Sequence, residues 1–308
     1  NNPLGVGDRV DLQLTQNYLP KGNLFYSAGY NIPVPGHPSS WFEFSAGKQM
    51  FTVGADQKAL GISGETNTLG ASFYHTAFAN RFHEMVLRTG LERQDAITKR
   101  FKTVVNEDNI SNLFFGFGYE RKDAVNTGFD TVDLQFSQGL DGNFGGMAKS
   151  VVPTRAIKPG RQGNKGNFAS NDWYTLRGRY RRVQSIDPDH LLIARVEGQW
   201  SNALLPGTQQ MSLGGPDSVR AYPVSEFLRD TAVFASLEWF WRAPGFADVD
   251  AWNGRKWGDI LSVSFFADYG VGTINQPNLG DDHAVDISGY GAALKVNLDN
   301  FSGRLQAA

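Results

Sequence analysis

The side-chain combinations that catalyse reactions or bind metals are missing from this 308-residue sequence. His83 and Glu84 start like a zinc-protease motif, but Leu87 stands where the second histidine belongs. Residues 160–166 contain glycines and Lys165, yet they lack the Gly-Lys-Ser/Thr ending of a phosphate-binding loop. The sequence has no cysteine, which excludes cysteine nucleophiles, cysteine-bound metals and a disulfide scaffold. It therefore predicts a protein that is not an enzyme and that binds no metal or cofactor.

The chemistry that the sequence does offer is charge pairing between one arginine and two carboxylates. Arg220 follows a bend-forming Gly-Gly-Pro at residues 214–216, where glycine permits backbone angles that other residues avoid. Its guanidinium presents two parallel N–H donors that match the two oxygens of a carboxylate. Asp268 and Glu238 are the candidate acceptors. Whether the three groups meet depends on the elements that carry them.

Apolar and polar residues alternate in segments of about ten residues along the whole chain, as they do in membrane-spanning strands. Val132, Leu134 and Phe136, for example, alternate with Asp133 and Gln135. A period of two is typical of β-strands with one apolar and one polar face. The alternation predicts thirteen strands, near residues 7–17, 23–32, 41–53, 68–79, 83–94, 110–122, 127–139, 171–184, 189–204, 230–242, 259–270, 285–297 and 302–308.

The lengths of these strands and of their connections favour a barrel that crosses a membrane. A tilted strand needs about 9–11 residues to cross a bilayer. Short connections, such as residues 80–82 and 185–188, alternate with long ones, which are expected at residues 54–66, 95–109, 140–170, 206–229 and 270–284. Short turns at one end and long loops at the other are typical of outer-membrane barrels. A soluble β-sandwich stays an alternative, because a sheet with one solvated face alternates in the same way.

Two features depart from this pattern. Residues 243–258 are long for a connection at the short-turn end, and Lys48 interrupts the apolar face of Phe42 and Phe44.

Five tryptophans can test the barrel prediction. Aromatic residues near strand ends fit the girdles at the two membrane surfaces, although cross-strand packing in a soluble sheet would also use them. The tryptophans in question are Trp41, Trp173, Trp200, Trp239 and Trp241.

The composition agrees with an all-β chain and limits its partners. Glycine is frequent, at 35 residues, and no run of about 18 apolar residues exists, which excludes a helical membrane protein. The net charge of −2 implies no attraction to nucleic acid. Residues 147–170 hold five basic residues and no acidic one, so this stretch is either a solvated loop or, at a cell surface, a contact for lipopolysaccharide phosphates. The five are Lys149, Arg155, Lys158, Arg161 and Lys165.

Three motifs resemble one family of outer-membrane proteins. Residues 205–223, which include Val219, Arg220 and Tyr222, resemble the inward-folded loop of the Omp85/two-partner secretion superfamily, whose tip reads Val-Arg-Gly-Tyr/Phe. Residues 266–270 are similar to the F-x-D-x-G strand motif of that superfamily, and residues 2–8 to an early periplasmic turn of its secretion branch. The chain thus resembles the haemolysin-activator branch (ShlB/FhaC/HecB, TpsB) more than the barrel-assembly branch. Ala221 replaces the usual glycine, so we expect a loop tip without a positive φ there.

The resemblance implies a transmembrane antiparallel β-barrel of the Omp85 type in the bacterial outer membrane. The family barrel has about 16 strands, preceded by a plug helix and POTRA domains. The motif at residues 2–5 aligns with the turn between the second and third strands. Residues 1–308 would therefore form strands 3–15, with the POTRA domains, the first two strands and the last strand outside this chain.

The resemblance also implies a gate inside the barrel. By alternation Asp268 faces away from the apolar row of Phe265 and Tyr269, and Glu238 lies on an inward face. An inward loop would carry Arg220 towards Asp268, with Glu238 as a second acceptor. In a partly wet lumen this contact would contribute about 1 kcal/mol, and more if it is dehydrated, which suits a latch better than a permanent lock. Gly214, Gly215, Val219 and Tyr222 would shape the loop, and Phe266 and Gly270 belong to the strand motif.

The function implied by the resemblance is protein secretion. The barrel would be the translocation pore of a two-partner (type Vb) system that exports a large unfolded β-helical exoprotein of the haemolysin, adhesin or haem-acquisition type. Its partners would be that exoprotein, outer-membrane lipids and lipopolysaccharide, with a monomeric barrel and no cofactor. An outer-membrane assembly factor of the same superfamily and a passive porin stay alternatives.

Overall fold

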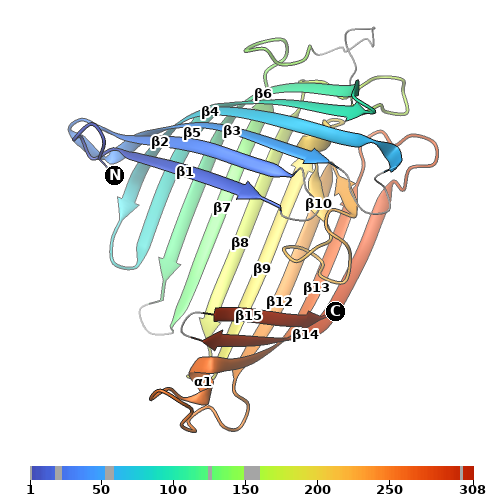
Figure 1. The fold of residues 1–308 in the computed structure, drawn as a ribbon. Helices are drawn as coiled ribbons and strands as arrows, with labels where there is room; N and C mark the ends of the chain where they lie inside the picture. The colour runs from blue at the N-terminus through green and yellow to red at the C-terminus, as the bar shows by residue number, and fades with distance from the viewer. Residues whose placement is uncertain (1, 18–22, 53–58, 124–126, 149–159, 299–300) are drawn as a thin grey trace.

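The computed structural model describes residues 2–17, 23–52, 59–123, 127–148, 160–298 and 301–308. Thirteen antiparallel strands form one sheet that curls into the wall of a barrel (Figure 1). The strands are β1 (Arg9–Gln16), β2 (Leu24–Val34), β3 (His37–Thr52), β4 (Ile62–Ala79), β5 (His83–Arg100), β6 (Thr103–Lys122), β7 (Gly128–Gly139), β8 (Tyr174–Ser185), β9 (His190–Ser201), β12 (Thr231–Arg242), β13 (Leu261–Thr273), β14 (Ala284–Leu298) and β15 (Phe301–Ala307).

Each of these strands pairs with the strands next to it in this order, as in a meander. Every predicted strand corresponds to one strand of the sheet. Two further strands, β10 (Met211–Leu213) and β11 (Phe227–Arg229), form a separate hairpin in the connection between β9 and β12. This hairpin was not predicted, because three-residue strands are too short to show alternation. Among the described residues, β1 and β15 each pair with one neighbour only.

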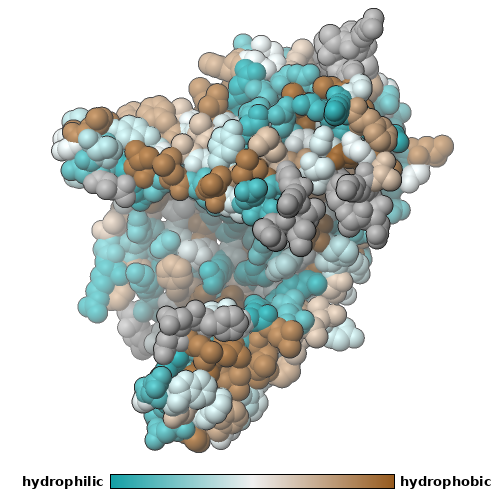
Figure 2. Space-filling model, viewed as in Figure 1, coloured by the Kyte–Doolittle hydropathy of each residue, from teal (hydrophilic) through white to brown (hydrophobic). Residues whose placement is uncertain are grey.

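The two faces of the sheet differ as a membrane barrel requires. On β13, Ser264 and Asp268 are buried on the inner face, whereas Phe265 and Tyr269 alternate with them and are 47% and 45% exposed on the outer face. Figure 2 shows a hollow between β1 and β15 with a largely hydrophilic inner wall, while hydrophobic residues gather outside along β1 and near β14. A soluble sandwich would bury its apolar face between sheets, so that alternative is wrong. In the described part of the chain, no helix is long and apolar enough to cross a membrane.

The barrel has a turn end and a loop end. At the turn end lie residues 35–36, 80–82 and 186–189, together with the turn at residues 2–8 that resembles a family motif. At the loop end lie the described parts of the long connections, residues 140–148, 160–173, 202–230 and 274–283. The turn at residues 2–8 is held by Asp8, whose carboxylate accepts the N–H of Leu4 at 3.1 Å and the hydroxyl of Tyr30 at 2.8 Å.

The predicted long connection at residues 95–109 is wrong. β5 continues to Arg100 and β6 starts at Thr103, so that only Phe101 and Lys102 form the turn, both with positive φ. The misreading has a physical cause, since the outer-face residues of β5 beyond Leu91 are mostly polar, namely Arg93, Asp95 and Lys99, with Ile97 among them. Strands that project past the bilayer no longer need an apolar face, and their sequence therefore reads as a loop.

The exceptions found in the sequence also have explanations. Lys48 lies near the loop-end terminus of β3, where Glu65 pairs with it at 3.0 Å and with Lys99 at 2.9 Å. It marks the edge of the apolar band rather than a break in it. The connection at 243–260 is indeed long, and it contains the short helix α1 (Trp257–Ile260) and a T-shaped contact of Trp252 with Trp257 at 5.6 Å.

Three of the five tryptophans fit a girdle and two do not. Trp200 is 53% exposed at the loop end of the outer face, while Trp239 and Trp241 stack on each other at the turn end. The girdle prediction is wrong for Trp173, which is 1% exposed and packs inside the barrel, and for Trp41, which stacks on Tyr74 on the inner face. Both tryptophans alternate with the apolar outer row of their strands, Trp173 with Tyr174 and Trp41 with Phe42, so the alternation itself places them on the inner face.

Candidate functional site

The connection between β9 and β12, residues 202–230, folds back inside the barrel (Figure 1). We call it the inward loop. Leu213 and Val219 of this loop are fully buried, in a cluster with Ala232 and Phe234 of β12 and Ile287 of β14. The loop is therefore seated on the inner wall by apolar packing as well as by polar contacts.

Glycines on the inner wall let the loop approach closely. A Cβ at Gly270 would lie 2.9 Å from a methyl group of Val219, and a Cβ at Gly289 would lie 2.8 Å from the Cβ of Ala221. Both distances are shorter than side chains tolerate, so the wall has no room there for a larger residue. Gly270 was predicted as a motif residue, whereas Gly289 was missed because its neighbour in the loop is visible only in three dimensions.

The bend of the loop uses its two glycines as predicted. Gly214 and Gly215 have φ angles of 102° and 103°, which side chains on other residues rarely allow. The N–H of Gly215 donates to the carbonyl of Tyr222 at 3.0 Å and closes the tip of the loop. Tyr222 packs edge-on against Phe227 at 5.8 Å and does not contact the acidic residues. It shapes the loop without joining the charged cluster.

Arg220 contacts both candidate acceptors. Its Nε and Nη2 donate to the two oxygens of Asp268, each at 2.8 Å, and its backbone N–H donates to the same carboxylate at 3.1 Å. Its Nη1 donates to Glu238 at 2.7 Å, and Nη2 also reaches the hydroxyl of Ser236 at 3.1 Å. The predicted contact between Arg220 and Asp268 is thus present, as a two-pronged fork.

The core of the cluster is buried, and its charges balance. The side chains of Arg220, Asp268 and Glu238 are 2%, 0% and 9% exposed. Glu238 also accepts a bond from Arg304 of β15 at 2.7 Å, so that two guanidinium groups face two carboxylates. The ring of Phe266 lies 3.6 Å from the guanidinium carbon of Arg220, which stacks on its face.

This burial selects the stronger of the two expected contacts. About 1 kcal/mol was expected in a partly wet lumen and more in a dehydrated one, and removing one partner of a buried pair costs about 3–5 kcal/mol. Burial by itself would lower the pKa of Arg220, yet the hydrogen bonds to Asp268 and Glu238 outweigh it, and the pKa is raised above its ordinary value. The arginine therefore stays charged, and the contact holds the loop more firmly than a surface ion pair would.

Sequence reasoning missed Arg304, although it completes the charge balance. It lies opposite Lys295 in the pairing of β14 with β15, and only that register brings it within reach of Glu238. In the part of the chain that the structure describes, no group of histidine and acidic side chains could hold a metal ion.

The basic stretch divides into three groups. Lys149, Arg155 and Lys158 lie outside the described residues, and Lys165 is exposed. Arg161 does not face outward as a lipopolysaccharide contact would, because its guanidinium pairs with the buried carboxylate of Asp230 at 2.6 Å. For Arg161 the expectation of a solvated or lipopolysaccharide-binding residue is therefore wrong.

A polar cavity of about 370 Å³ separates the inward loop from the wall formed by β7–β9. Asp133, Arg179 and Glu197 of the wall line it, together with Thr208 and Gln210 of the loop. Arg88 of β5 forks onto Asp133 at 2.6 and 3.0 Å, and Arg179 reaches the same acid at 3.1 Å. The wall opposite the charged cluster is thus hydrophilic and internally paired.

Similar proteins give this architecture a family. The chain matches the sequence model of the haemolysin secretion/activation proteins ShlB/FhaC/HecB over residues 1–296. It is 22% identical to the heme/hemopexin transporter protein HuxB of Haemophilus influenzae over 313 aligned residues, which cover 96% of this chain and 49% of HuxB. The chain thus spans about half the length of this relative.

Solved structures with the same fold agree. CdiB from Escherichia coli superposes with a TM-score of 0.71 at 18% identity, over 99% of this chain and 53% of CdiB. CdiB from Acinetobacter baumannii gives 0.66 at 14% identity, over 98% and 50%. BamA from Haemophilus ducreyi, in a structure lacking POTRA domains 1–3, gives 0.52 at 13% identity, over 97% and 71%. The chain belongs to the haemolysin secretion/activation family ShlB/FhaC/HecB and forms an Omp85-type β-barrel of the bacterial outer membrane.

Proposed function

We propose that this barrel is the translocation pore of a two-partner secretion system, which exports an unfolded exoprotein. Family membership supports this proposal, and one observation carries it: a loop folded into the lumen holds a buried arginine against two acids of the wall. In a permanently open channel, the cost of desolvating such a cluster would bring no benefit. In a gate that must close and reopen, the cluster holds the closed state.

The inner surfaces suit an unfolded polypeptide. An extended chain exposes backbone N–H and C=O groups that need partners in a narrow channel. The wall at Asp133, Arg179 and Glu197 offers both donors and acceptors, and the side chain of Arg179 is 64% exposed. Directional movement would come from folding of the cargo outside the cell, without a nucleotide or other cofactor.

Release of the loop would leave part of the charged cluster paired. If Arg220 moves away with the loop, Glu238 keeps Arg304 and the hydroxyl of Ser264, which donates at 2.6 Å. Asp268 would lose three hydrogen bonds and become the one acid that water or cargo must solvate. The free-energy cost of opening the gate therefore falls mainly on one carboxylate, that of Asp268.

The exported cargo would be an exoprotein of the haem-acquisition type. The likeness to HuxB, a heme/hemopexin transporter protein by name, supports an exoprotein of the haem-acquisition type over the haemolysin and adhesin types. The remaining partners would be outer-membrane lipids and lipopolysaccharide around the apolar outer face, with the barrel as a monomer.

The test replaces Arg220 by Ala in the full-length protein produced together with its exoprotein. We expect barrel insertion, measured by heat-dependent migration in gels, to persist while exoprotein in the medium falls at least about tenfold, since without its main contact the loop tip no longer returns to the wall after each transport event. Arg81→Ala, at an exposed arginine of the turn at residues 80–82, is the matched control and should secrete normally. Normal secretion by the Arg220→Ala protein would contradict the gate.

The two alternatives give different results. An assembly factor of the same superfamily, a role that the fold likeness to BamA favours, would cause loss of many outer-membrane proteins on deletion of the gene. A passive porin would show a steady conductance in planar bilayers. A secretion pore shows neither, and its deletion affects one exoprotein.

A further inference from the structure

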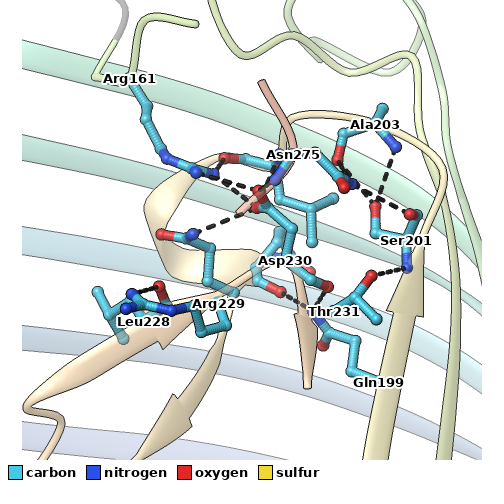
Figure 3. A network of polar contacts seen from close by, with 12 residues as sticks. Arg161, Gln199, Ser201, Ala203, Leu228, Arg229, Asp230, Thr231 and Asn275 are labelled. Atoms are coloured by element: carbon cyan, nitrogen blue, oxygen red, sulfur yellow. Dashed lines mark hydrogen bonds and ion pairs between the residues drawn. The ribbon is translucent and has the colours of Figure 1, made fainter. Parts of the chain in front are cut away.

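A second buried acid holds the base of the inward loop, by which we mean its two ends at residues 202–210 and 230. Asp230, the residue before β12, is 0% exposed. Its oxygens accept bonds from the two Nη atoms of Arg161 at 2.6 and 3.0 Å, from the backbone N–H of Leu205 at 3.2 Å and of Asn275 at 2.7 Å, and from the amide of Gln210 at 3.2 Å. Figure 3 shows this carboxylate at the centre of its network.

These donors come from three different connections at the loop end. Arg161 belongs to the connection between β7 and β8, Leu205 and Gln210 to the inward loop, and Asn275 to the connection between β13 and β14. Asn275 also donates to the carbonyls of Ser201 and Ala203, at 3.1 and 2.8 Å (Figure 3). One carboxylate thus joins three segments that are far apart in sequence.

The two outer segments also contact each other directly. The N–H of Asn164 donates to the carbonyl of Gln276 at 3.1 Å, and the amide of Asn278 donates to the carbonyl of Gln162 at 2.6 Å. Residues 160–170, residues 274–283 and the base of the inward loop form one polar layer, which we call the cap. Because Ala169 within this layer is 1% exposed, the cap is closed to water at that point.

We propose that Asp230 is a positioning residue for the gate: it ties the cap together and fixes the base of the inward loop, so that the loop tip presents Arg220 to Asp268. Arg220 lies midway in sequence between Gln210 and Asp230, the two residues that anchor the loop base. A tip that swings from a fixed base returns to the same contact after each transport event. This inference rests on the proposed function and adds to it a second residue that acts through Arg220.

The experiment uses the full-length protein with Ala169→Cys. Residues 1–308 contain no cysteine of their own, and any cysteine outside them is replaced by Ser. A membrane-impermeant maleimide added to intact cells reports whether the cap opens. We expect slow labelling with Asp230 in place, and labelling roughly tenfold faster after Asp230→Asn, because an orphaned Arg161 opens the cap. Asp217→Asn, at an exposed acid of the inward loop, should label as slowly as the parent.

A double variant separates a specific clamp from general damage. Arg161→Gln alone should also speed labelling, and Arg161→Gln combined with Asp230→Asn should be no faster than either single change, since the same contact is lost in all three. If Asp230→Asn labels as slowly as its parent, or if the two changes add, Asp230 is not the clamp. Fast labelling of the parent protein would also overturn the inference, because the cap would then be open.

The labelling experiment can refute the role of Asp230 without refuting the proposed secretion function, and the reverse also holds. Labelling of the cap does not depend on cargo, and exoprotein secretion by the Arg220→Ala protein does not depend on the reporter cysteine. If Asp230 is a positioning residue, Asp230→Asn should also reduce secretion about as much as Arg220→Ala does, while heat-dependent migration shows an intact barrel. A loosened cap with unchanged secretion would refute the positioning role.

Discussion

The tip and the base of the inward loop are both held by a buried acid and an arginine, but in different ways. At the tip, the loop supplies the arginine and the rigid wall supplies Asp268 and Glu238. At the base, the acid is Asp230, and two of its donors are backbone N–H groups, that of Leu205 in the loop itself and that of Asn275 in the connection between β13 and β14. Release of the tip therefore breaks one backbone hydrogen bond, from the N–H of Arg220 to Asp268, whereas release of the base breaks two, from Leu205 and Asn275. This difference divides the loop into a movable part and an anchor.

The largest expected effect comes from removing the acid at the tip. Asp268→Ala deletes the fork and leaves Arg220 buried with Glu238 as its one remaining acid, which should weaken loop seating by about 3–5 kcal/mol. We expect the purified full-length barrel to be open most of the time in planar bilayers, where the parent is mostly closed. Asp248→Ala, at a side chain that is 91% exposed at the turn end, is the control. A closed Asp268→Ala barrel would mean that apolar packing alone holds the tip.

A smaller effect is expected from Glu238→Gln. The glutamine keeps one oxygen for Arg220 but loses the charge that Arg220 and Arg304 share, so seating should weaken by about 1.5–3 kcal/mol. The open fraction in the same bilayer recordings should lie between those of the parent and of Asp268→Ala. If Glu238→Gln opens the barrel more than Asp268→Ala does, Glu238 rather than Asp268 is the main partner of the tip.

The alternation of apolar and polar residues predicted the acids that contact the tip of the loop better than the contacts at its base. Alternation places Asp268 and Glu238 on the inner face, because strand residues have only two directions to choose from. It could not show that Asp230 joins three segments, since the donors to its carboxylate lie in connections that have no strand pattern. The contact of Arg220 with Asp268 came from the resemblance of their motifs to a family, and the register that brings in Arg304 came only from the structure.

The polar segment at residues 95–109 teaches the converse lesson. There alternation weakens, yet β5 and β6 continue, because hydrogen bonding between the two strands does not require an apolar face outside the bilayer. Sequence patterns thus detect the part of a barrel that contacts lipid better than its full strand length.

The close fit of the tip against the wall can be tested with one methyl group. Gly289→Ala would place a Cβ 2.8 Å from that of Ala221, and such overpacking costs about 1–3 kcal/mol. We expect more frequent openings in bilayer recordings. Gly198→Ala is the matched control, because its nearest neighbour would be a methyl of Val233 at an ordinary 3.5 Å. Equal behaviour of the two variants would show that the tip moves aside at no cost.

The smallest effect is expected at the base, where the donors are redundant. Gln210→Ala removes one hydrogen bond of 3.2 Å, while Asp230 keeps Arg161 and the backbone N–H groups of Leu205 and Asn275. The loss should be about 0.5–1.5 kcal/mol, and labelling of the cysteine at Ala169 should rise by less than after Asp230→Asn. If instead Gln210→Ala opens the cap as fully as Asp230→Asn, the base depends on a side chain of the loop itself. It would then be as detachable as the tip, and the division of the loop into anchor and movable part would not hold.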